Sequence, residues 1–438
     1  MKLSGWGQYP VIDTHVQKPK SLKELCDAVI AGNTIPRGNG RSYGDSAIGK
    51  TNTIDMRNFN RVLEFNSETG LLVAESGLLL SDIIDKFLQK GWFPLVTPGT
   101  KFVTLGGLVA ADVHGKNHHK DGSFCACLSW IEILDKNGEL KKCSRNKNKE
   151  MFFWTVGGMG LTGTIVKVAL YLQPVSSAWI KQETIPAKNI SHAIEIFEKR
   201  LETKYSVAWI DCSTKKKNLG RSLVYLGEHA LASDLRNDKS LKPLETGKHT
   251  SINVPFNLPP FVLNKFSIRI FNKFYFWLGT KKQKKLVSWN NYFYPLDRLR
   301  NWNRIYGKRG FAQFQCVIPL KNALCGMQEL LETISECGAS SFLGVLKRLG
   351  DQEGYISFPM KGYTLALDFP ITRENLELMK RLDQITIKYG GRFYLAKDSR
   401  MSSTVFKNSD PRFINLRKFI DENIGHTYKS VQSERLDL

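Results

Sequence analysis

The sequence predicts an α+β protein of two domains. Its 438 residues are enough for two or three hydrophobic cores. In the first part, short strand-like runs outnumber helices and do not alternate with them as a doubly wound sheet would require. After residue 174 the alternating runs lengthen. We therefore expect one mixed domain over residues 1–175, an antiparallel-sheet domain over 176–394, and a C-terminal segment, 395–438, that returns to the first domain.

The first domain combines two helices with several short strands. Ser21-Leu-Lys-Glu24 fits a capping box and predicts a helix over 21–31, which Gly32 ends. A second helix over 80–90 is ended by Gly91. Strands are expected at 34–36, 53–56, 62–65, 71–76, 130–135, 139–143 and 164–172, with hairpin loops at 66–70 and 136–138.

The second domain combines long alternating runs with amphipathic helices. Strands are expected at 205–211, 312–318 and 363–369, and helices at 323–337, 373–389 and, in the tail, 410–423. Residues 255–285 form an insertion in which a run rich in aromatic side chains ends in Lys281-Lys-Gln-Lys-Lys285. This insertion fits either a peripheral contact with an anionic membrane or a buried helix with a solvated basic end.

The charge balance is strongly basic. The chain has 63 Lys+Arg against 41 Asp+Glu, a net charge of +22. Such a field attracts phosphorylated ligands, anionic lipid surfaces or nucleic acid. No nucleic-acid-binding motif accompanies the charge, so we expect no nucleic-acid partner. The first residues lack a signal-peptide core, no run is apolar enough to span a membrane, and the eight cysteines show no disulfide rhythm. We expect a cytoplasmic location.

Residues 98–124 read as the floor of a ligand site. Glycines such as Gly99, Gly106 and Gly107 allow close approach of the backbone to a ligand. Apolar neighbours such as Leu105 and Leu108 indicate burial of the segment. Its polar residues are Thr104, Asp112, His114, Lys116, Asn117, His118 and His119.

Two further glycine-rich loops surround this floor in the sequence. Residues 37–46 place glycines between arginines and serines, which suits either a pyrophosphate cradle or a polar turn that stabilises itself. Gly158-Met-Gly-Leu-Thr-Gly163 matches the dinucleotide fingerprint, but the strand-like run 164–172 follows where a helix should open. We therefore expect no Rossmann site there, although the glycines could still meet a cofactor through a loop.

A metal site is not predicted. His118, His119, Cys125 and Cys127 have a spacing that belongs to no common zinc pattern. The common hydrolase and nucleotide-triphosphatase signatures are also absent from the sequence.

Three motifs resemble flavoproteins of the vanillyl-alcohol oxidase/p-cresol methylhydroxylase fold: Arg37-Gly-Asn-Gly-Arg-Ser-Tyr-Gly-Asp45, the run from Pro98-Gly-Thr to His114-Gly-Lys-Asn-His-His119, and Val156-Gly-Gly-Met-Gly-Leu-Thr-Gly163. Within that group, the second motif and Ala396-Lys-Asp-Ser-Arg400 are similar to the decaprenylphosphoryl-β-D-ribose 2-oxidase family, the flavin subunits of 2-epimerases. Matches also occur around residues 302–307, 313–315 and 357–359, so the resemblance covers nearly the whole chain.

The resemblance implies an FAD cofactor bound along the glycine-rich loops. Several relatives attach the flavin through a histidine where this chain has Arg41, which implies non-covalent FAD. The implied FAD-binding residues are Pro36, Arg37, Gly38, Asn39, Gly40, Arg41, Ser42, Tyr43, Gly44, Asp45, Ser46, Gly99, Thr104, Leu105, Gly106, Gly107, Ala111, Asp112, Val113, His114, Ile165 and Tyr394.

The resemblance also implies a substrate site above the flavin. Its residues are His114, Lys116, Tyr292, Phe293, Gln313, Gln315, Lys347 and Lys397, with Phe293 where the family pattern has a tyrosine. We expect Lys397 to be the essential catalytic residue and His114 to orient substrate and flavin.

The expected function is oxidation of the C2 hydroxyl of a polyprenyl-phosphoryl-β-D-ribose to the 2-keto sugar. A separate NADH-dependent keto-sugar reductase would complete the ribose-to-arabinose epimerisation for cell-wall glycan synthesis. The lipid-linked substrate implies a peripheral position on the inner face of the cell membrane. One alternative is an FAD-dependent oxidase of a free sugar, alditol or aldonolactone. The other is a non-redox, basic membrane- or nucleic-acid-binding protein.

Overall fold

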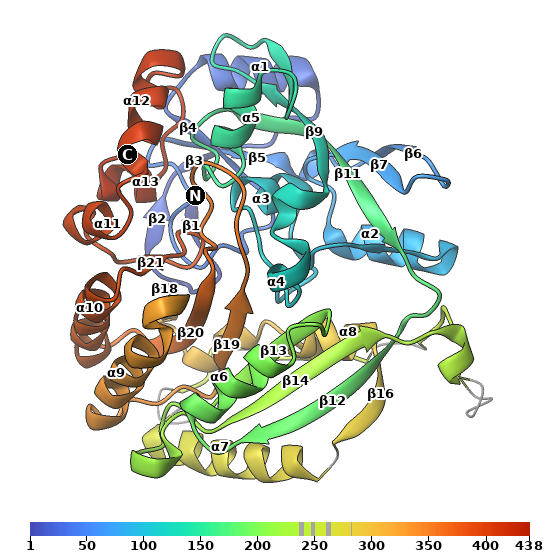
Figure 1. Ribbon diagram of the computed structural model, residues 1–438. Helices are drawn as coiled ribbons and strands as arrows, with labels where there is room; N and C mark the ends of the chain where they lie inside the picture. The colour runs from blue at the N-terminus through green and yellow to red at the C-terminus, as the bar shows by residue number, and fades with distance from the viewer. Residues whose placement is uncertain (236–240, 247–249, 260–263, 282) are drawn as a thin grey trace.

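The computed structural model describes residues 1–235, 241–246, 250–259, 264–281 and 283–438. The chain before residue 175 forms a domain of short helices with parallel and antiparallel strands (Figure 1). Most of the chain after residue 175 forms a large antiparallel sheet with helices. This arrangement confirms the predicted α+β class with an antiparallel-sheet second domain.

A small parallel sheet carries the first glycine-rich loop. Its strands β3 (His15–Gln17), β5 (Asn52–Asp55) and β4 (Thr34–Arg37) lie in that order. The predicted capping box is present at α1 (Leu22–Ile30), because the Ser21 hydroxyl accepts a hydrogen bond from the Glu24 amide at 3.2 Å. Strand β1 (Lys2–Ser4) pairs with β2 (Val11–Asp13) beside this sheet.

The other sheet of the first domain is antiparallel, in the order β10-β9-β11-β7-β6, with β8 on β11. Its strands are β6 (Val62–Phe65), β7 (Leu71–Glu75), β8 (Trp92–Pro94), β9 (Leu128–Leu134), β10 (Leu140–Ser144) and β11 (Thr164–Pro174). Helix α2 (Leu80–Phe87) ends near Gly91, which has a φ of 81°. Residues 158–163 form a loop between α5 (Lys149–Thr155) and strand β11, which confirms that no Rossmann helix opens there.

Residues 98–124 fold as loops around two short helices, α3 (Leu105–Ala110) and α4 (His118–Asp121). The Thr104 hydroxyl caps α3 by accepting from the Gly107 amide at 3.4 Å. Leu105 and Leu108 are fully buried in the core of the first domain, as the apolar pattern predicted.

The second domain is built on one eight-stranded antiparallel sheet, in the order β16-β12-β14-β13-β19-β20-β18-β21. The strands are β12 (Trp179–Ala187), β13 (Tyr205–Ile210), β14 (Ser222–His229), β16 (Lys284–Ser288), β18 (Phe311–Pro319), β19 (Gly344–Leu349), β20 (Gly362–Pro370) and β21 (Arg392–Phe393). The three strands expected near residues 205, 312 and 363 are therefore confirmed.

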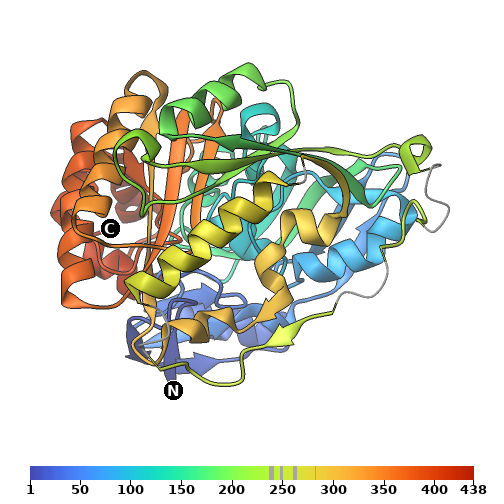
Figure 2. The same cartoon turned by 90° about the horizontal axis from the view of Figure 1, so that it is seen from below.

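The two faces of this sheet have different partners. Helices α6 (Ile190–Lys199), α9 (Ala323–Glu336) and α10 (Arg373–Lys388) cover one face. Helix α7 (Lys265–Thr280) packs on the other face, along β12 and β14. Figure 2, a view from below, shows α7 lying across the sheet. Because side chains alternate along a strand, every second residue points away from α6, α9 and α10 and toward the first domain.

Shorter elements complete the second domain. Strands β15 (Ile252–Asn253) and β17 (Leu299–Arg300) pair in parallel, and helix α8 (Trp289–Phe293) follows β16. Residues 260–263 and 282 of the aromatic insertion lie outside the described residues.

The C-terminal segment packs on the first domain, with helices α11 (Ser403–Ser409), α12 (Phe413–Asn423) and α13 (Val431–Leu436). The Thr34 amide donates to the Thr427 carbonyl, and the Lys429 amide donates to the Thr34 carbonyl, so the segment extends the β3-β5-β4 sheet. Arg435 forms ion pairs with Asp45 at 2.8 Å and with Asp398 at 2.9 Å. In the part of the chain that the structure describes, no helix is both long and apolar enough to cross a bilayer.

Candidate active site

A cavity of about 520 Å³ lies between the two domains, a size typical of ligand sites. The first domain contributes the loops around residues 36–47, 97–116 and 159–165. The second domain contributes the sheet face that points away from its covering helices, in particular alternating residues of β13, β18, β19 and β20.

The first glycine-rich loop is shaped by close contacts that only glycine permits. A Cβ atom at Gly38 would lie 2.1 Å from the Thr104 hydroxyl, so the backbone of this loop lies directly against the residue that caps α3. Gly40 has a φ of 63°, and a Cβ there would lie 2.4 Å from the Arg37 guanidinium. Arg37 is itself held by donating to the Ser4 carbonyl at 2.8 Å.

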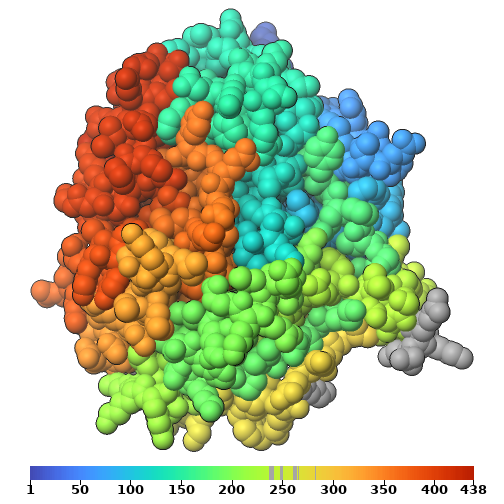
Figure 3. All heavy atoms as spheres, in the orientation of Figure 1, coloured from blue at the N-terminus to red at the C-terminus, as the bar shows by residue number. Residues whose placement is uncertain are grey.

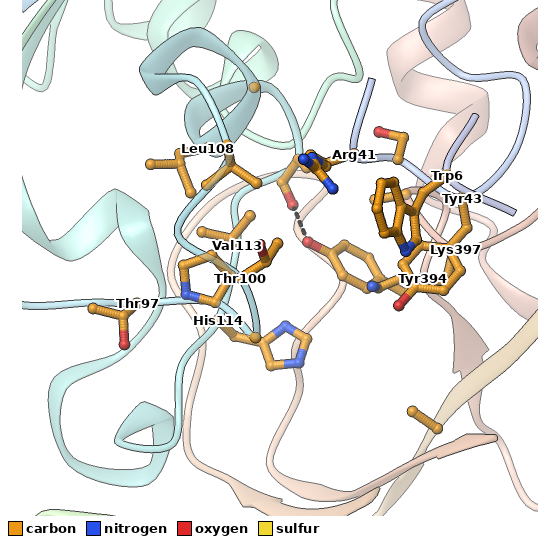
Figure 4. A pocket seen from close by; sticks show the side chains of 18 of the residues that line it. Trp6, Arg41, Tyr43, Thr97, Thr100, Leu108, Val113, His114, Tyr394 and Lys397 are labelled. Atoms are coloured by element: carbon orange, nitrogen blue, oxygen red, sulfur yellow. Dashed lines mark hydrogen bonds between the residues drawn. The ribbon is translucent and has the colours of Figure 1, made fainter. Parts of the chain in front are cut away.

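Several buried polar atoms beside this loop lack a hydrogen-bond partner among the described residues. They include the Ser46 and Ser76 hydroxyls and Arg41 Nε. The Arg41 guanidinium lies 4.1 Å above the ring of Trp6, and Figure 4 shows both side chains at the cavity. Buried polar groups are normally hydrogen-bonded, so their position around a cavity fits a polar ligand.

His114 lies in the middle of the cavity as a neutral, oriented imidazole. The Gln315 amide donates to His114 Nε2 at 3.3 Å and leaves the ring proton on Nδ1, which has no partner among the described residues. Burial, with a smaller contribution from Lys347, holds the pKa of His114 well below its usual range. Tyr394 lies against this ring, and its hydroxyl donates to the Ala111 carbonyl at 3.1 Å (Figure 4).

Three half-buried lysines, Lys116, Lys347 and Lys397, line the same cavity. Lys116 donates to the Tyr292 carbonyl, and its Nζ lies 4.4 Å from the Tyr292 ring. Lys397 Nζ lies 3.7 Å from the ring of Tyr43. Burial lowers the pKa of Lys116 to about 7 and that of Lys347 to about 8. Within the described chain, none of the three lysines has a carboxylate within ion-pair distance.

A buried carboxylate, Asp368, lies behind Lys397. Gln313 donates to Asp368 Oδ1 at 2.5 Å, across the paired strands β18 and β20. Burial lowers the pKa of Lys397, and the negative charge of Asp368 opposes that effect. Burial likewise raises the pKa of Asp368. Burial therefore favours the neutral amine of Lys397, the form that a base near a reacting hydroxyl requires, and Asp368 favours the protonated form.

Most of the residues predicted for FAD and substrate line this cavity. They are Pro36, Arg37, Gly38, Asn39, Gly40, Arg41, Ser42, Tyr43, Ser46, Gly99, Thr104, Gly106, Gly107, Ala111, Val113, His114, Lys116, Ile165, Tyr292, Phe293, Gln313, Gln315, Lys347, Tyr394 and Lys397. The structure therefore brings together residues up to about three hundred and sixty positions apart in the chain.

Four predicted residues lie outside the lining and instead hold it in place. Gly44 packs against the backbone of residues 398 and 399, and Asp45 is paired with Arg435. The Leu105 side chain points into the apolar core. Asp112 accepts hydrogen bonds from Ser123, Ser357 and the Cys125 amide, so it ties the loops of two domains together.

The paired histidines also lie outside the cavity lining. His118 bonds to Gln352 at 2.8 Å and to the Gly350 amide at 3.0 Å, while His119 Nε2 bonds to the Thr203 carbonyl at 2.9 Å. Among the described residues, no group of three or more His, Cys, Asp or Glu is arranged to hold a metal ion.

Sequence reasoning missed one end of the cavity. Strands β13, β14 and β19, the residue before β19, and helix α7 line it with apolar and aromatic side chains: Val207, Trp209, Tyr225, Val345, Leu343 and Tyr275. The alternating run at 205–211 was a usable signal, because it marked Val207 and Trp209 as lying on one face. The alternating pattern did not indicate which of the two faces of this strand would line the cavity.

The cavity fits an extended flavin dinucleotide. Gly99 faces open space, since a Cβ there would have no neighbour within 4 Å, and Gly38, Gly40, Gly106 and Gly107 also line the cavity. The unpartnered hydroxyls and Arg41 Nε supply polar contacts along the first domain. The sheet face of the second domain adds Gln313, Gln315 and Lys347 to the same cavity.

Comparisons with known proteins agree with this fit. The family model described as "FAD binding domain" matches residues 15–144. Decaprenylphosphoryl-beta-D-ribose oxidase from Mycolicibacterium smegmatis is 31% identical, over all of this chain and 97% of that protein. An uncharacterized protein in the mprA 5' region of Streptomyces coelicolor is 27% identical, over 74% of this chain and 90% of that protein. L-gulonolactone oxidase from Bos taurus is 28% identical, over 43% of each chain.

The fold, the cavity and these matches define an FAD-dependent oxidoreductase with the two-domain vanillyl-alcohol oxidase/p-cresol methylhydroxylase fold. FAD is its cofactor, and the non-redox alternative is wrong. More specifically, the chain belongs to the family of decaprenylphosphoryl-β-D-ribose oxidase.

Proposed function

We propose that this enzyme oxidises the C2 hydroxyl of a polyprenyl-phosphoryl-β-D-ribose to the 2-keto sugar. The observation that carries the proposal is the pair of half-buried lysines Lys116 and Lys347, which line one cavity with no ion-pair partner among the described residues. Buried charges are stable only when they are compensated, so this cavity selects an anionic ligand. A phosphodiester held by Lys116 and Lys347 would supply the missing negative charge.

The protein's own groups position the sugar and take its proton. Bound FAD supplies the hydride acceptor for oxidation of the alcohol. The neutral His114 offers its Nδ1 proton to a ligand oxygen, while Gln315 fixes the ring. Burial favours the neutral amine of Lys397, which can then accept the hydroxyl proton. Asp368 stabilises the ammonium that results.

The flavin is proposed to be bound without a covalent link. Arg41 stands where several relatives of this fold carry a flavin-linking histidine, and its guanidinium stacks on Trp6. Denaturation in trichloroacetic acid should therefore release all of the FAD into the supernatant.

A complete epimerisation would need a second enzyme, because oxidation at C2 yields a ketone that must be reduced from the other face. We propose a separate NADH-dependent keto-sugar reductase in that role, leading from ribose to arabinose for cell-wall glycans. The relative from Mycolicibacterium smegmatis, whose name specifies a decaprenylphosphoryl ribose, supports the substrate class.

The alternative substrate class is a free sugar, alditol or aldonolactone. Its support is the match to L-gulonolactone oxidase, which covers 43% of the chain. An uncharged sugar would leave Lys116 and Lys347 uncompensated, so the lipid-phosphoryl sugar is favoured.

Anaerobic flavin reduction tests the proposal. The holoenzyme is mixed with farnesyl-phosphoryl-β-D-ribose, free ribose, a polyol or L-gulonolactone, and bleaching is followed near 450 nm. We expect bleaching with the first compound only. Lys397→Ala should abolish it, and Lys347→Gln should raise the ligand concentration required, whereas Lys321→Gln, an exposed control, should change neither. Bleaching by the polyol or the lactone, but not by the phosphoryl sugar, would refute the proposal.

A further inference from the structure

Helix α7 exposes one continuous apolar stripe. Phe266, Ile270, Phe274, Trp277 and Leu278 follow at helical spacing and are all exposed. Phe266 is 73% exposed, Phe274 56% and Trp277 51%. In Figure 3 the segment containing α7 forms the lower edge of the molecule. A contiguous apolar patch of this kind marks an interaction surface rather than a scatter of single side chains.

The opposite face of α7 is firmly seated on the sheet. Asn272 is fully buried and donates to Asp211 Oδ1 at 2.9 Å and to the Ser341 carbonyl. At Gly279 a Cβ would lie 2.1 Å from Leu223 on β14, so the helix lies as close to the sheet as its backbone allows. The helix is therefore anchored, and its exposed stripe is a fixed part of the surface.

The surroundings of the stripe are strongly basic. Residues 251–300 contain nine Lys or Arg and a single acidic residue, Asp297. That carboxylate faces inward and accepts a hydrogen bond from the Lys101 amide. On the outside, Lys281 Nζ lies over the Trp277 ring at 3.3 Å. Aromatic side chains bordered by lysines are the pattern that binds the interface of an anionic bilayer.

The inner face of the same helix reaches the active-site cavity. Tyr275 lines the cavity, its ring lies 4.8 Å from that of Trp209, and its hydroxyl accepts from the Tyr225 hydroxyl at 3.0 Å. Trp277 is two residues further along the chain and lies on the exposed side. One helix thus separates the exposed stripe from the apolar end of the cavity.

We propose that α7 rests on an anionic phospholipid bilayer and that the apolar end of the cavity beneath it receives the lipid chain of the substrate. This inference rests on the proposed function, because it concerns how a lipid-linked sugar enters that site. A second copy of the chain is a poorer occupant. A two-fold interface through this stripe would place two clusters of basic residues against each other.

Vesicle binding tests the docking surface. Holoenzyme is sedimented with phosphatidylglycerol/phosphatidylcholine vesicles and with phosphatidylcholine vesicles alone. We expect binding to the anionic vesicles, lowered on the order of tenfold by Phe266→Ser/Phe274→Ser/Trp277→Ser and about fivefold by Lys273→Gln. Ile414→Ser, on the distant α12 and 67% exposed, is the matched control and should leave binding unchanged. Flavin content and circular dichroism verify that each variant is folded.

Undiminished vesicle binding by the triple variant would overturn the docking surface. A concentration-dependent dimer that the triple variant abolishes would do the same, because it would identify a second copy as the occupant.

Chain length tests the apolar end of the cavity. Phosphoryl-ribose substrates carrying one, two or three isoprene units are compared in detergent-free solution. Each buried methylene contributes about fourfold in affinity, so KM should fall at least tenfold along the series. A KM that does not change with chain length would refute the lipid-chain assignment. If none of these phosphoryl-ribose substrates bleaches the flavin, the proposed function would be refuted instead. The vesicle experiment would still decide whether α7 binds an anionic bilayer.

Discussion

Gly38→Ala is expected to weaken FAD binding through a defined steric conflict. The new Cβ would lie 2.1 Å from Thr104 Oγ1, well inside contact distance, and 3.2 Å from Thr104 Cβ. Either the glycine-rich loop or the start of α3 must then move, and both line the cavity. Overpacking of this kind costs about 1–3 kcal/mol, which corresponds to roughly a fivefold to 150-fold rise in the Kd for FAD if the strain is borne by the bound state.

A double variant separates this steric account from a general loss of folding. Thr104→Ala removes the clashing hydroxyl, at the cost of about 0.5–2 kcal/mol for the lost helix cap. Relative to Thr104→Ala alone, adding Gly38→Ala should then change FAD affinity by less than threefold. FAD affinity is measured by fluorescence titration of apoprotein, with urea unfolding as a parallel measure of stability.

The steric reasoning would be refuted in two ways. Gly38→Ala could retain wild-type FAD affinity, which would show that the loop absorbs the methyl group freely. Alternatively, the effects of the two substitutions on FAD affinity could be additive, which would show that the Gly38→Ala methyl group does not clash with Thr104.

Two further predictions concern charge. A 2-deoxyribose phosphodiester analogue, whose own charge is constant, should bind more weakly as the pH rises from 6 to 9, because Lys116 and Lys347 lose their protons at a pKa of about 7 and about 8. Lys347→Gln should remove the part of this weakening that occurs at the higher pH values. An affinity that does not change with pH would contradict the assignment of the two lysines to the phosphodiester. Arg435→Met should lower the free energy of unfolding by about 3–5 kcal/mol in urea titrations, since it leaves Asp45 and Asp398 buried without their ion-pair partner. Arg417→Met removes an exposed ion pair with Asp437 and should leave the free energy of unfolding nearly unchanged. Equal effects of the two substitutions would contradict this prediction.

Local patterns in the sequence were sufficient for most of the secondary structure and for much of the cofactor site. The Ser21 cap, the stop at Gly91 and the alternating strands depend on neighbouring residues only, and they form as expected. The resemblance to the flavoprotein fold predicted FAD, and the loops that it named line one cavity in the structure. The strand after Gly163 was enough to reject a Rossmann site, because the required helix had no sequence to form it.

Residues within correctly predicted loops were harder to sort. Four residues are neighbours of cavity-lining residues in the chain but contact other parts of the protein instead of the cavity: Gly44, Asp45, Leu105 and Asp112. Asp45 turns away because its partner, Arg435, is 390 positions distant. No local pattern encodes such a distant partner. The sequence therefore could not show which residues of these loops line the cavity and which hold the loops in place.

The sequence by itself determined the fold class, the glycine-rich loops, the basic charge and the aromatic character of the insertion. Only the tertiary structure decided that Gln315 orients His114 across 201 positions, that three lysines share one cavity, and that α7 has an exposed stripe opposite a cavity wall. The physical reason is that periodicity fixes which side chains share a face of a strand or helix, whereas the partner of that face is chosen by the packing of elements distant in the chain.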